Sequence, residues 1–521
     1  MTSFEKSATW TEPPGALSGF SWAVATIAVA AVVTGLPILA HLSGQPVGIA
    51  ICFVLVLLVA VFATPMLPVV LVFSYLFQNL FVAFVSPEIL DLNEFKAIRG
   101  YNFLLTATAW MVVVFRYWID RGSFDRRFRA LMNVSFLGLG LVGLYFAIGL
   151  TSSPTNAAIY LRNIATPLML FDIFAVVAAQ FRLTIHTAFA AMAYAIVAYG
   201  YAELFFHEPL LRLVNGDVYL QLLNKQAHDA GVWVKEMLET GRVFRSDLDS
   251  LEVEFLNTPL LGDHGIRVFR LLGPNFHPIS YAYALAAFSL IAGGTGSLMY
   301  WAFSLPLLII IGSKGALVLV LLSMAGFVGS KVLGGRWLIW CYLVVLAAYA
   351  AAGIVVGIRA EDYHVIGFIG GLKGFLQNVL GHGLGTGGNW SLDMALLDWG
   401  RSQRLGHTDV AVESAVGVLL FQMGIAALVL LACVASLAWR AWRLYMDRND
   451  RLTGIVALGV LTVLVNGIFQ EEALFSPLAL GVMMGILGLV LGRALRPNAR
   501  IGVATTRVEH LAKPFAGAAG R

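Results

Sequence analysis

Charged side chains are scarce in this chain. Asp, Glu, Lys and Arg together make up 12% of its 521 residues, whereas 59% of the residues are apolar. Soluble domains carry about 25% charged residues, because water must wet their surface. The shortage excludes an ordinary soluble protein and indicates that lipid covers much of the exterior.

Cysteine and clustered metal ligands are scarce too. The three cysteines, Cys52, Cys341 and Cys433, lie far apart inside apolar runs, without paired or histidine-flanked spacing. We interpret them as core residues, so neither a disulfide framework nor a zinc site is expected. The acidic residues between 393 and 409 are too widely spaced to form the oxygen cluster that a divalent ion requires. The sequence therefore predicts no metal ion and no other cofactor.

Ionisable residues are few within the apolar runs. Asp172, His186 and Glu203 are the main examples, and no series of partners accompanies them. A proton-coupled pump is expected to carry such a series, so the pattern disfavours ion-driven transport. The net charge of +4 is small, and the excess Arg lies in short loops, so no nucleic-acid partner is expected.

Apolar runs are what the chain has in abundance. About fourteen of them approach the length that a helix needs to cross a bilayer. They cover approximately residues 19–42, 46–63, 65–85, 101–119, 132–151, 164–181, 184–206, 279–293, 297–312, 315–331, 337–358, 411–436, 453–469 and 474–493. We predict an all-α fold, a single polytopic transmembrane helix bundle over residues 1–521. The N-terminus lacks the basic start and cleavage site of a signal peptide, so the run from Phe20 to Leu42 is expected to remain as a spanning helix.

The short loops predict the orientation of the bundle. Arg residues gather in segments 116–129, 440–451 and 493–500, which fall on one side when fourteen spans are threaded. The positive-inside rule makes that side, and both termini, cytoplasmic. Two long segments, 207–278 and 359–410, then lie on the opposite side. Three- and four-residue spacing of apolar residues predicts amphipathic helices in the first, and the glycine content of the second argues against a long regular helix there.

Charged and imidazole side chains gather at the predicted outer ends of the spans. The candidates are Arg162, Arg267, Arg270, Lys314, His407, Asp409 and Glu413. Such cations can hold a lipid-linked diphosphate while a carboxylate or imidazole accepts a proton from an attacking hydroxyl. A simpler interpretation is also open, because basic residues at span ends anchor helices at the interface and a carboxylate near a helix start is favoured by the helix dipole.

Four motifs in the second half of the chain carry a resemblance to a known family. They are Arg270-Leu-Leu-Gly273 followed by Pro278 and Ala282, Ser313-Lys314-Gly315, Gly381-His-Gly383-Leu-Gly385, and Glu413-Ser414 followed after nine residues by Gly424. Together they resemble the O-antigen ligase and polysaccharide polymerase superfamily of bacterial inner membranes, whose corresponding motifs are Arg-x-x-Gly, Ser-Arg-Gly, Gly-x-Gly-x-Gly and a His-containing motif with the same nine-residue spacing. Two residues depart from the family pattern, Lys314 in place of Arg and Glu413 in place of His.

The resemblance implies an inverting, metal-independent glycosyltransferase of the bacterial inner membrane. Its donor would be an undecaprenyl-diphosphate-linked glycan in the lipid bilayer, and a chain-length regulator would be a candidate partner. The residues expected to bind the diphosphate are Arg270, Lys314, Arg162 and Arg267. Glu413 or His407 would be the catalytic base, and Gly383, Gly385 and Asp409 would belong to the substrate loop.

The Glu413 departure favours the polymerase activity of the superfamily over its ligase activity. Ligases of the superfamily carry His where this chain has Glu413, so a polymerase that joins repeat units at the periplasmic face is the preferred interpretation. Lys314 lacks the planar fork with which Arg binds a phosphate through two parallel hydrogen bonds. A ligase that moves finished glycan to lipid A core or to a protein hydroxyl is the first alternative, and a polysaccharide flippase is the second.

Overall fold

The structure is a computed structural model that describes residues 16–89, 91–229, 231, 251–255, 267–391 and 397–496. Its first half is helical apart from short connections. The helices are α1 (Ala16–His41), α2 (Gln45–Phe62), α3 (Leu67–Val85), α4 (Leu92–Arg99), α5 (Tyr101–Ile119), α6 (Arg126–Gly149), α7 (Pro154–Gln180), α8 (His186–Leu213) and α9 (Gly216–Asp229), with single 3-10 turns at Thr64–Met66, Ser86–Glu88 and Arg121–Ser123.

The second half adds one small sheet and the remaining helices. Strands β1 (Glu252–Glu254) and β2 (Arg267–Phe269) pair antiparallel, with Val253 opposite Val268. The helices are α11 (Pro278–Thr295), α12 (Leu298–Ile311), α13 (Lys314–Leu333), α14 (Gly335–Arg359), α15 (Tyr363–Gln377), α17 (Trp399–Leu405), α18 (Ala415–Met423), α19 (Ile425–Arg448), α20 (Arg451–Asn466), α21 (Glu471–Phe475), the π-helical turn η7 (Pro477–Gly481) and α22 (Val482–Ala494).

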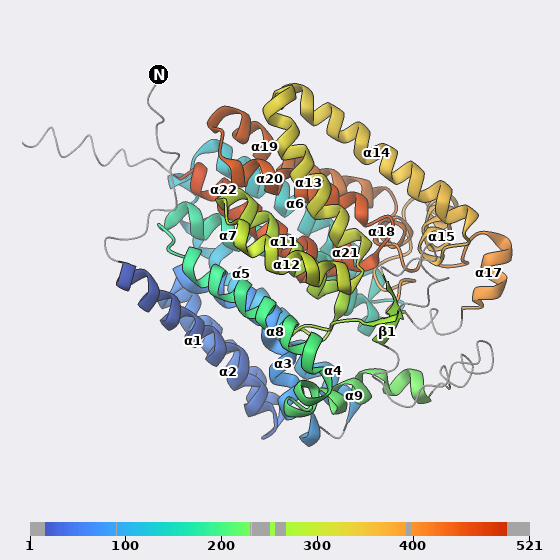
Figure 1. The fold of residues 1–521 in the computed structure, drawn as a ribbon, viewed down its shortest axis with the longest axis horizontal. Coiled ribbons are helices and arrows are strands. Elements are labelled where there is room, and N and C mark those ends of the chain that lie inside the picture. Colours follow the sequence, from blue (N-terminus) through green and yellow to red (C-terminus); the bar gives the residue numbers. More distant parts are fainter. Residues whose placement is uncertain are drawn as a thin grey trace, which may run out of the picture.

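The long helices run side by side as one bundle (Figure 1). Within the described ranges, eleven helices are long and apolar enough to cross a membrane, and the apolar helices α12 and α20 are shorter, at 14 and 16 residues. The predicted class, an all-α polytopic membrane protein, is therefore confirmed in outline, while the number of fourteen spans stays a prediction. One predicted run, 411–436, is divided into α18 and α19 at Gly424, whose φ of 56° is left-handed.

The centre of the bundle is the pair α7 and α22. In their most apolar windows 89% and 83% of the residues are buried, compared with 17% for α14, which lies on the outside. Glycines allow the close approach: a Cβ atom on Gly488 would lie 2.5 Å from the carbonyl oxygen of Phe171. Small residues at a contact between membrane helices let the backbones approach closely. The van der Waals attraction between them stabilises the contact, because lipid provides no hydrophobic driving force for helix association.

The first part of the glycine-rich segment 359–410 is helical, although its glycine content argued against a long regular helix there. Helix α15 is a regular helix of 15 residues. Gly371 shows the reason, since a Cβ atom there would lie 2.6 Å from the Cα atom of Gly417 on α18. The glycines thus form a face on which two helices pack with their backbones in contact, and this packing offsets the low helix propensity of glycine.

The described parts of the three Arg-rich segments lie at one end of the bundle. The connection at residues 150–153 joins α6 to α7 at the end opposite the Arg-rich segments. Arg126 at the start of α6 and Gln180 at the end of α7 therefore both lie at the Arg-rich end. Arg496 after α22 donates to the carbonyl oxygen of Ala178 there. The hairpin between α19 and α20 turns at the same end, since α19 begins beside Gly381 at the opposite one. Helices α4, α9, α15, α17, α18 and α21 gather at that opposite end, on the right-hand side and lower right of Figure 1.

Candidate functional site

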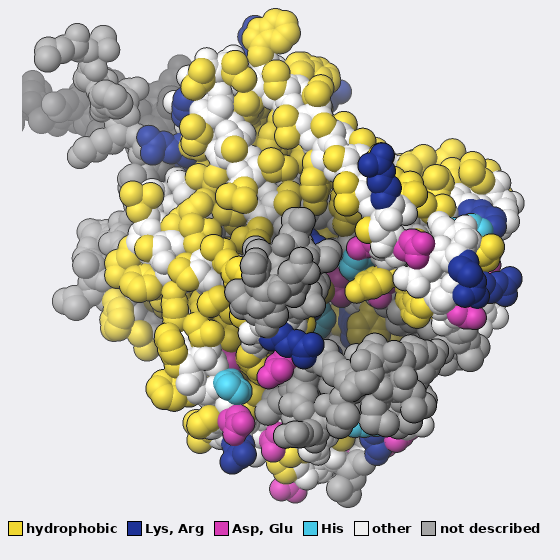
Figure 2. All heavy atoms as spheres, turned by 45° about the vertical axis from the view of Figure 1, so that its right-hand side comes forward, with side chains coloured by type: hydrophobic (Ala, Val, Ile, Leu, Met, Phe, Trp, Pro, Cys, Tyr) yellow, Lys and Arg dark blue, Asp and Glu magenta, His cyan; other side chains and the backbone are white. Residues whose placement is uncertain are grey.

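A hollow opens at the end of the bundle away from the Arg-rich segments. Acidic, histidine and basic side chains gather in and around it (Figure 2). The ionisable residues that interact with one another at this end of the bundle come from α4, α7, the turn before α11, the segment 389–390, α15, the segment before α18, and α21. We call them the residues of the hollow. These segments are distant in the sequence and meet only because the helices end at the same level.

Glu413 lies beside an imidazole in this hollow. Its Oε2 is 3.4 Å from Nδ1 of His364 on α15, and both side chains are partly buried. Nδ1 of His364 also lies 3.2 Å from the carbonyl oxygen of Glu413. Asp362 fixes the backbone of His364, because its Oδ1 accepts the backbone N–H of His364 at the start of α15. A carboxylate and an imidazole in this arrangement can share the removal of a proton from a hydroxyl.

The backbone of Glu413 is held in a conformation that non-glycine residues rarely adopt. Its φ is 61°, in the left-handed region. The N–H of Glu413 donates to Oδ1 of Asn389 at 2.8 Å, so the neighbouring loop fixes this conformation. Left-handed conformations of this kind cluster at functional sites, where the surrounding structure compensates for the strain.

Glu471 completes the support of Asn389. One carboxyl oxygen of Glu471 accepts the hydroxyl of Tyr160 at 2.9 Å, and the other accepts the N–H of Asn389 at 3.1 Å. Burial raises the pKa of Glu471 to about 8, and the nearby charges of Glu472 and Glu413 act in the same direction. The network therefore links α7, the 389–390 segment and α21 directly to the backbone of Glu413.

The charges of Arg270 and Glu472 interact at this end of the bundle. Burial raises the pKa of Glu472, with Glu413 adding to the effect, while His364 and Arg270 oppose it. Burial also disfavours the charged form of Arg270 and so lowers its pKa, while the charges of Glu472 and Tyr363 oppose that change. Among the described residues the buried Nε of Arg270 has no hydrogen-bond acceptor. Arg270 is therefore a cation with a nearby counter-charge and an unused donor.

The turn that carries Arg270 is clamped by a buried carboxylate. Both oxygens of Glu203 on α8 accept backbone N–H groups, from Leu272 and Gly273, at 2.8 Å each. The φ of Gly273 is 65°, and a Cβ there would overlap the ring of Tyr281. The Arg-x-x-Gly motif is thus a tight turn. Its glycine allows the left-handed backbone conformation of the turn, and its arginine is the candidate functional side chain. Glu203, a candidate for ion transport by its position in a span, has this structural role.

Arg162 lies on another face of α7 from Tyr160. Its Nε donates to Oδ1 of the adjacent Asn163 at 3.0 Å, and its charge interacts with that of Arg99 at the end of α4. His277, at the start of α11, lies near both Arg99 and Arg270. Burial lowers the pKa of His277 to about 4, and these two cations add to the effect. A row of basic groups therefore runs from α7 past α4 to the Arg270 turn.

Two other predicted cations stand apart from this row. Lys314 is exposed at the first position of α13. The adjacent Gly315 packs against the side chain of Gln470, so Lys314 lies at the same end of the bundle as Glu471. Arg267 is exposed on β2 and is three residues from Arg270 along the chain.

The remaining predicted residues have other contacts. Nε2 of His407 lies 2.9 Å from Nζ of Lys373, and Asp409 is exposed. Gly383 and Gly385 pack against the connection between α6 and α7: a Cβ on Gly383 would lie 2.9 Å from the backbone nitrogen of Gly149, and one on Gly385 would lie 2.7 Å from the carbonyl carbon of Asn156. Both glycines therefore have a packing role that anchors the loop, and the described contacts place neither beside Glu413.

Several residues of the hollow escaped the sequence analysis. Glu471 and Glu472 could have been found, because they lie between the apolar runs 453–469 and 474–493 at a predicted outer end. A charge at the outer end of a run is the pattern that selected Glu413. His364 and Asn389 lie within the glycine-rich segment 359–410, where no predicted span begins or ends, so the pattern that selected Glu413 does not select them. Arg99 ends a short helix before a span and resembles an ordinary interfacial anchor.

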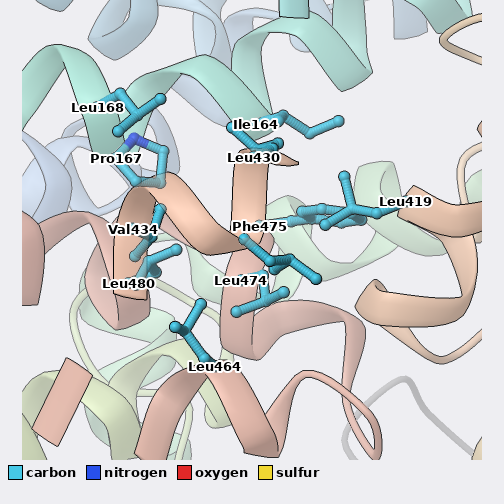
Figure 3. Close-up of a pocket in the computed structure, with 11 residues that line it drawn as sticks. Ile164, Pro167, Leu168, Leu419, Leu430, Val434, Leu464, Leu474, Phe475 and Leu480 are labelled. Carbon is cyan, nitrogen blue, oxygen red and sulfur yellow. The ribbon is translucent and has the colours of Figure 1, made fainter. Parts of the chain in front are cut away.

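An apolar cavity lies between α7, α18, α19, α20, α21 and η7 (Figure 3). It is lined by Ile164, Pro167, Leu168, Leu419, Leu430, Leu431, Val434, Leu464, Leu474, Phe475 and Leu480. Leu474 and Phe475 belong to the same short helix as Glu472, α21, and the Phe475 ring packs edge-on against Tyr160, with 5.8 Å between the ring centres. The lining contains no ionisable side chain, so the cavity is a neighbour of the polar site and not part of it.

Comparisons with known proteins return no match: no protein-family model, no curated protein and no solved structure is similar to this chain. The fold and the hollow therefore define the class as a multi-pass helical membrane protein with a cluster of ionisable residues at one end. Within the described residues, no group of three or more His, Cys, Asp or Glu side chains is arranged to hold a metal ion.

Proposed function

We propose that this protein is a membrane glycosyltransferase that joins lipid-linked oligosaccharides, as a polymerase of undecaprenyl-diphosphate-linked repeat units at the periplasmic face of a bacterial inner membrane. One observation carries the proposal: guanidinium groups and a carboxylate–imidazole pair interact, through Glu472, at one end of a membrane bundle. The donor brings a diphosphate and the acceptor brings a hydroxyl, and the two halves of the hollow suit these two groups.

The reaction uses the groups in order. The Glu413 carboxylate accepts the proton of the acceptor hydroxyl, and the oxygen forms a bond to the anomeric carbon of the donor sugar. The bond between that carbon and the diphosphate oxygen breaks, and the electron pair leaves with the lipid diphosphate. Arg270 stabilises the charge that develops on the leaving group, because its buried Nε–H has no acceptor among the described residues and can donate to the diphosphate. Attack from the opposite side inverts the configuration at the anomeric carbon.

Glu413 is favoured over His407 as the base. Glu413 lies in the cluster with His364, Glu472 and, through Glu472, Arg270, whereas His407 contacts Lys373. Lys314 and Arg267 remain at the same end of the bundle as additional cations for the approaching donor. A ligase would use the same donor half and differ only in its acceptor.

An elongation assay tests the proposal. Purified protein receives a defined lipid-diphosphate oligosaccharide together with a chelator, and the products are separated by length. We expect wild type to build longer chains, and Glu413→Gln and Arg270→Gln to lose activity by about 100-fold or more, as general-base and charge-stabilising residues do.

Two controls match the variants. Glu361 is also a glutamate with positive φ, 52°, but it is exposed between α14 and α15, so Glu361→Gln should keep full activity. Arg401 is exposed on α17, so Arg401→Gln should do the same. Absence of elongation by wild type, or normal elongation by Glu413→Gln, contradicts the proposal, and transfer of glycan to a different acceptor without elongation would favour the ligase.

A further inference from the structure

Two guanidinium groups at this end of the bundle interact with one another, and neither has a carboxylate partner among the described residues. Arg162 on α7 and Arg99 at the end of α4 interact as like charges. In the described part of the chain, neither forms an ion pair; the ion pairs there join His41 to Glu94, Arg212 to Glu208 and His364 to Glu413. Arg270 differs from both, because Glu472 provides a counter-charge nearby.

Both side chains are held in place while their terminal nitrogens remain available. The Arg99 guanidinium lies 5.3 Å from the centre of the Phe95 ring and 5.8 Å from that of Tyr219, and the Arg99 carbonyl accepts a hydrogen bond from Gln78 at 3.0 Å. Arg162 uses only Nε, in its bond to Asn163. Among the described residues, the terminal nitrogens of both arginines donate to no acceptor.

His277 adds a neutral donor between these arginines and Arg270. Its Nδ1 accepts the N–H of Ser280, so the ring proton lies on Nε2. Burial and the two neighbouring cations lower the pKa of His277 to about 4, which keeps the ring uncharged near neutral pH. A neutral donor among cations suits a phosphate oxygen without adding to the repulsion.

Two partly buried cations that repel one another are unfavourable unless an anion joins them. A diphosphate fits this pair, since it presents two adjacent anionic groups and guanidinium binds phosphate through parallel hydrogen bonds. We propose that Arg99 and Arg162 are the principal binding site for the diphosphate of an isoprenoid-linked donor, with Arg270 at the side of that site where the sugar bond breaks. This inference rests on the proposed function and assigns to Arg99 a role that the sequence did not indicate.

The division of the hollow follows from this assignment. Arg99, Arg162 and His277 form a basic half that holds the donor, and Glu413 with His364 belongs to an acidic half that receives the acceptor. Arg270 lies between the two halves, since it interacts with both His277 and Glu472. A donor bound in this way would present its anomeric carbon toward Glu413.

Ligand binding by the full-length protein in detergent tests the assignment. The probes are farnesyl diphosphate, farnesyl monophosphate and inorganic pyrophosphate, and the dissociation constant is measured for each by calorimetric titration. We expect wild type to bind farnesyl diphosphate more tightly than either other probe. Arg99→Gln and Arg162→Gln should each weaken that binding by about 10-fold or more, which corresponds to a lost charge-assisted hydrogen bond.

Variants separate a binding role from a structural one. Arg99→Lys keeps the charge and should retain part of the affinity, and Arg401→Gln should bind as wild type does. Without ligand, Arg162→Gln should unfold at the same temperature as wild type or higher, because a repulsion has been removed. A residue needed only for folding would lower that temperature instead.

Each other outcome is decisive. Unchanged affinity in Arg99→Gln overturns the assignment, and loss of binding in Arg270→Gln alone moves the diphosphate to Arg270 while leaving the proposed function intact. Equal affinity for pyrophosphate and farnesyl diphosphate would overturn the lipid-linked donor as the ligand. Binding that depends on Arg99 and Arg162 in a protein that never elongates chains would support this inference and contradict the proposed function.

Discussion

Glu471→Gln should make the stability of the protein less dependent on pH. Glu471 is buried, and its carboxyl oxygens accept hydrogen bonds from Tyr160 and Asn389. Burial raises its pKa from an ordinary 4.5 to about 8. The folded protein therefore keeps the proton over a range of pH in which the unfolded chain has lost it.

The sign and size of the effect follow from this difference. The contribution of Glu471 to the free energy of unfolding is fully present below pH about 4.5 and is lost as the pH rises through about 8. One pKa unit corresponds to about 1.4 kcal/mol, so the whole shift has an upper bound of about 5 kcal/mol. The contribution of Glu471 to the stability of wild type should therefore fall by about 3 kcal/mol between pH 5 and pH 8. Gln carries no titrating proton and should remove most of this slope.

Thermal unfolding in detergent at several pH values measures the slope directly. Gln removes one acceptor and so lowers stability at every pH, but this offset does not change the slope. Glu361→Gln serves as the control, because Glu361 is exposed and the variant should follow wild type. Retention of the wild-type slope by Glu471→Gln would contradict this prediction.

Three further changes test the geometry. Glu413→Gly should unfold with a free energy about 1 kcal/mol higher than Glu413→Ala, because glycine adopts a φ of 61° without the Cβ clash, and equal thermal stability of the two would contradict this. Glu203→Ala should lower the free energy of unfolding by about 2–4 kcal/mol, since two buried N–H groups lose their acceptor, and should also lose elongation activity; a variant as stable as wild type would refute the clamp. Gly371→Ala should destabilise by about 1–3 kcal/mol through backbone overlap, whereas Gly140→Ala, with open space around it, should be neutral or stabilising, and similar thermal shifts for both would be evidence against the helix contact.

The site could be predicted from the sequence only in part. Arg162, Arg270 and Glu413 were candidates because charge at the end of an apolar run is a local signal, and the structure places all three at the hollow. His407 had the same signal, but its ring lies against Lys373. Which imidazole accompanies Glu413 depends on how α15 packs on α18, and that contact joins residues 49 positions apart.

The sequence by itself determined the class of fold. A chain with so little charge must bury its backbone hydrogen bonds inside helices when lipid surrounds it, and the apolar runs indicate where those helices lie. Only the tertiary structure decided that Arg99 approaches Arg162, and that Glu471 on α21 supports Asn389 and through it Glu413. Helix formation depends on neighbours along the chain, whereas the meeting of these groups depends on which helix faces pack together and where each helix ends.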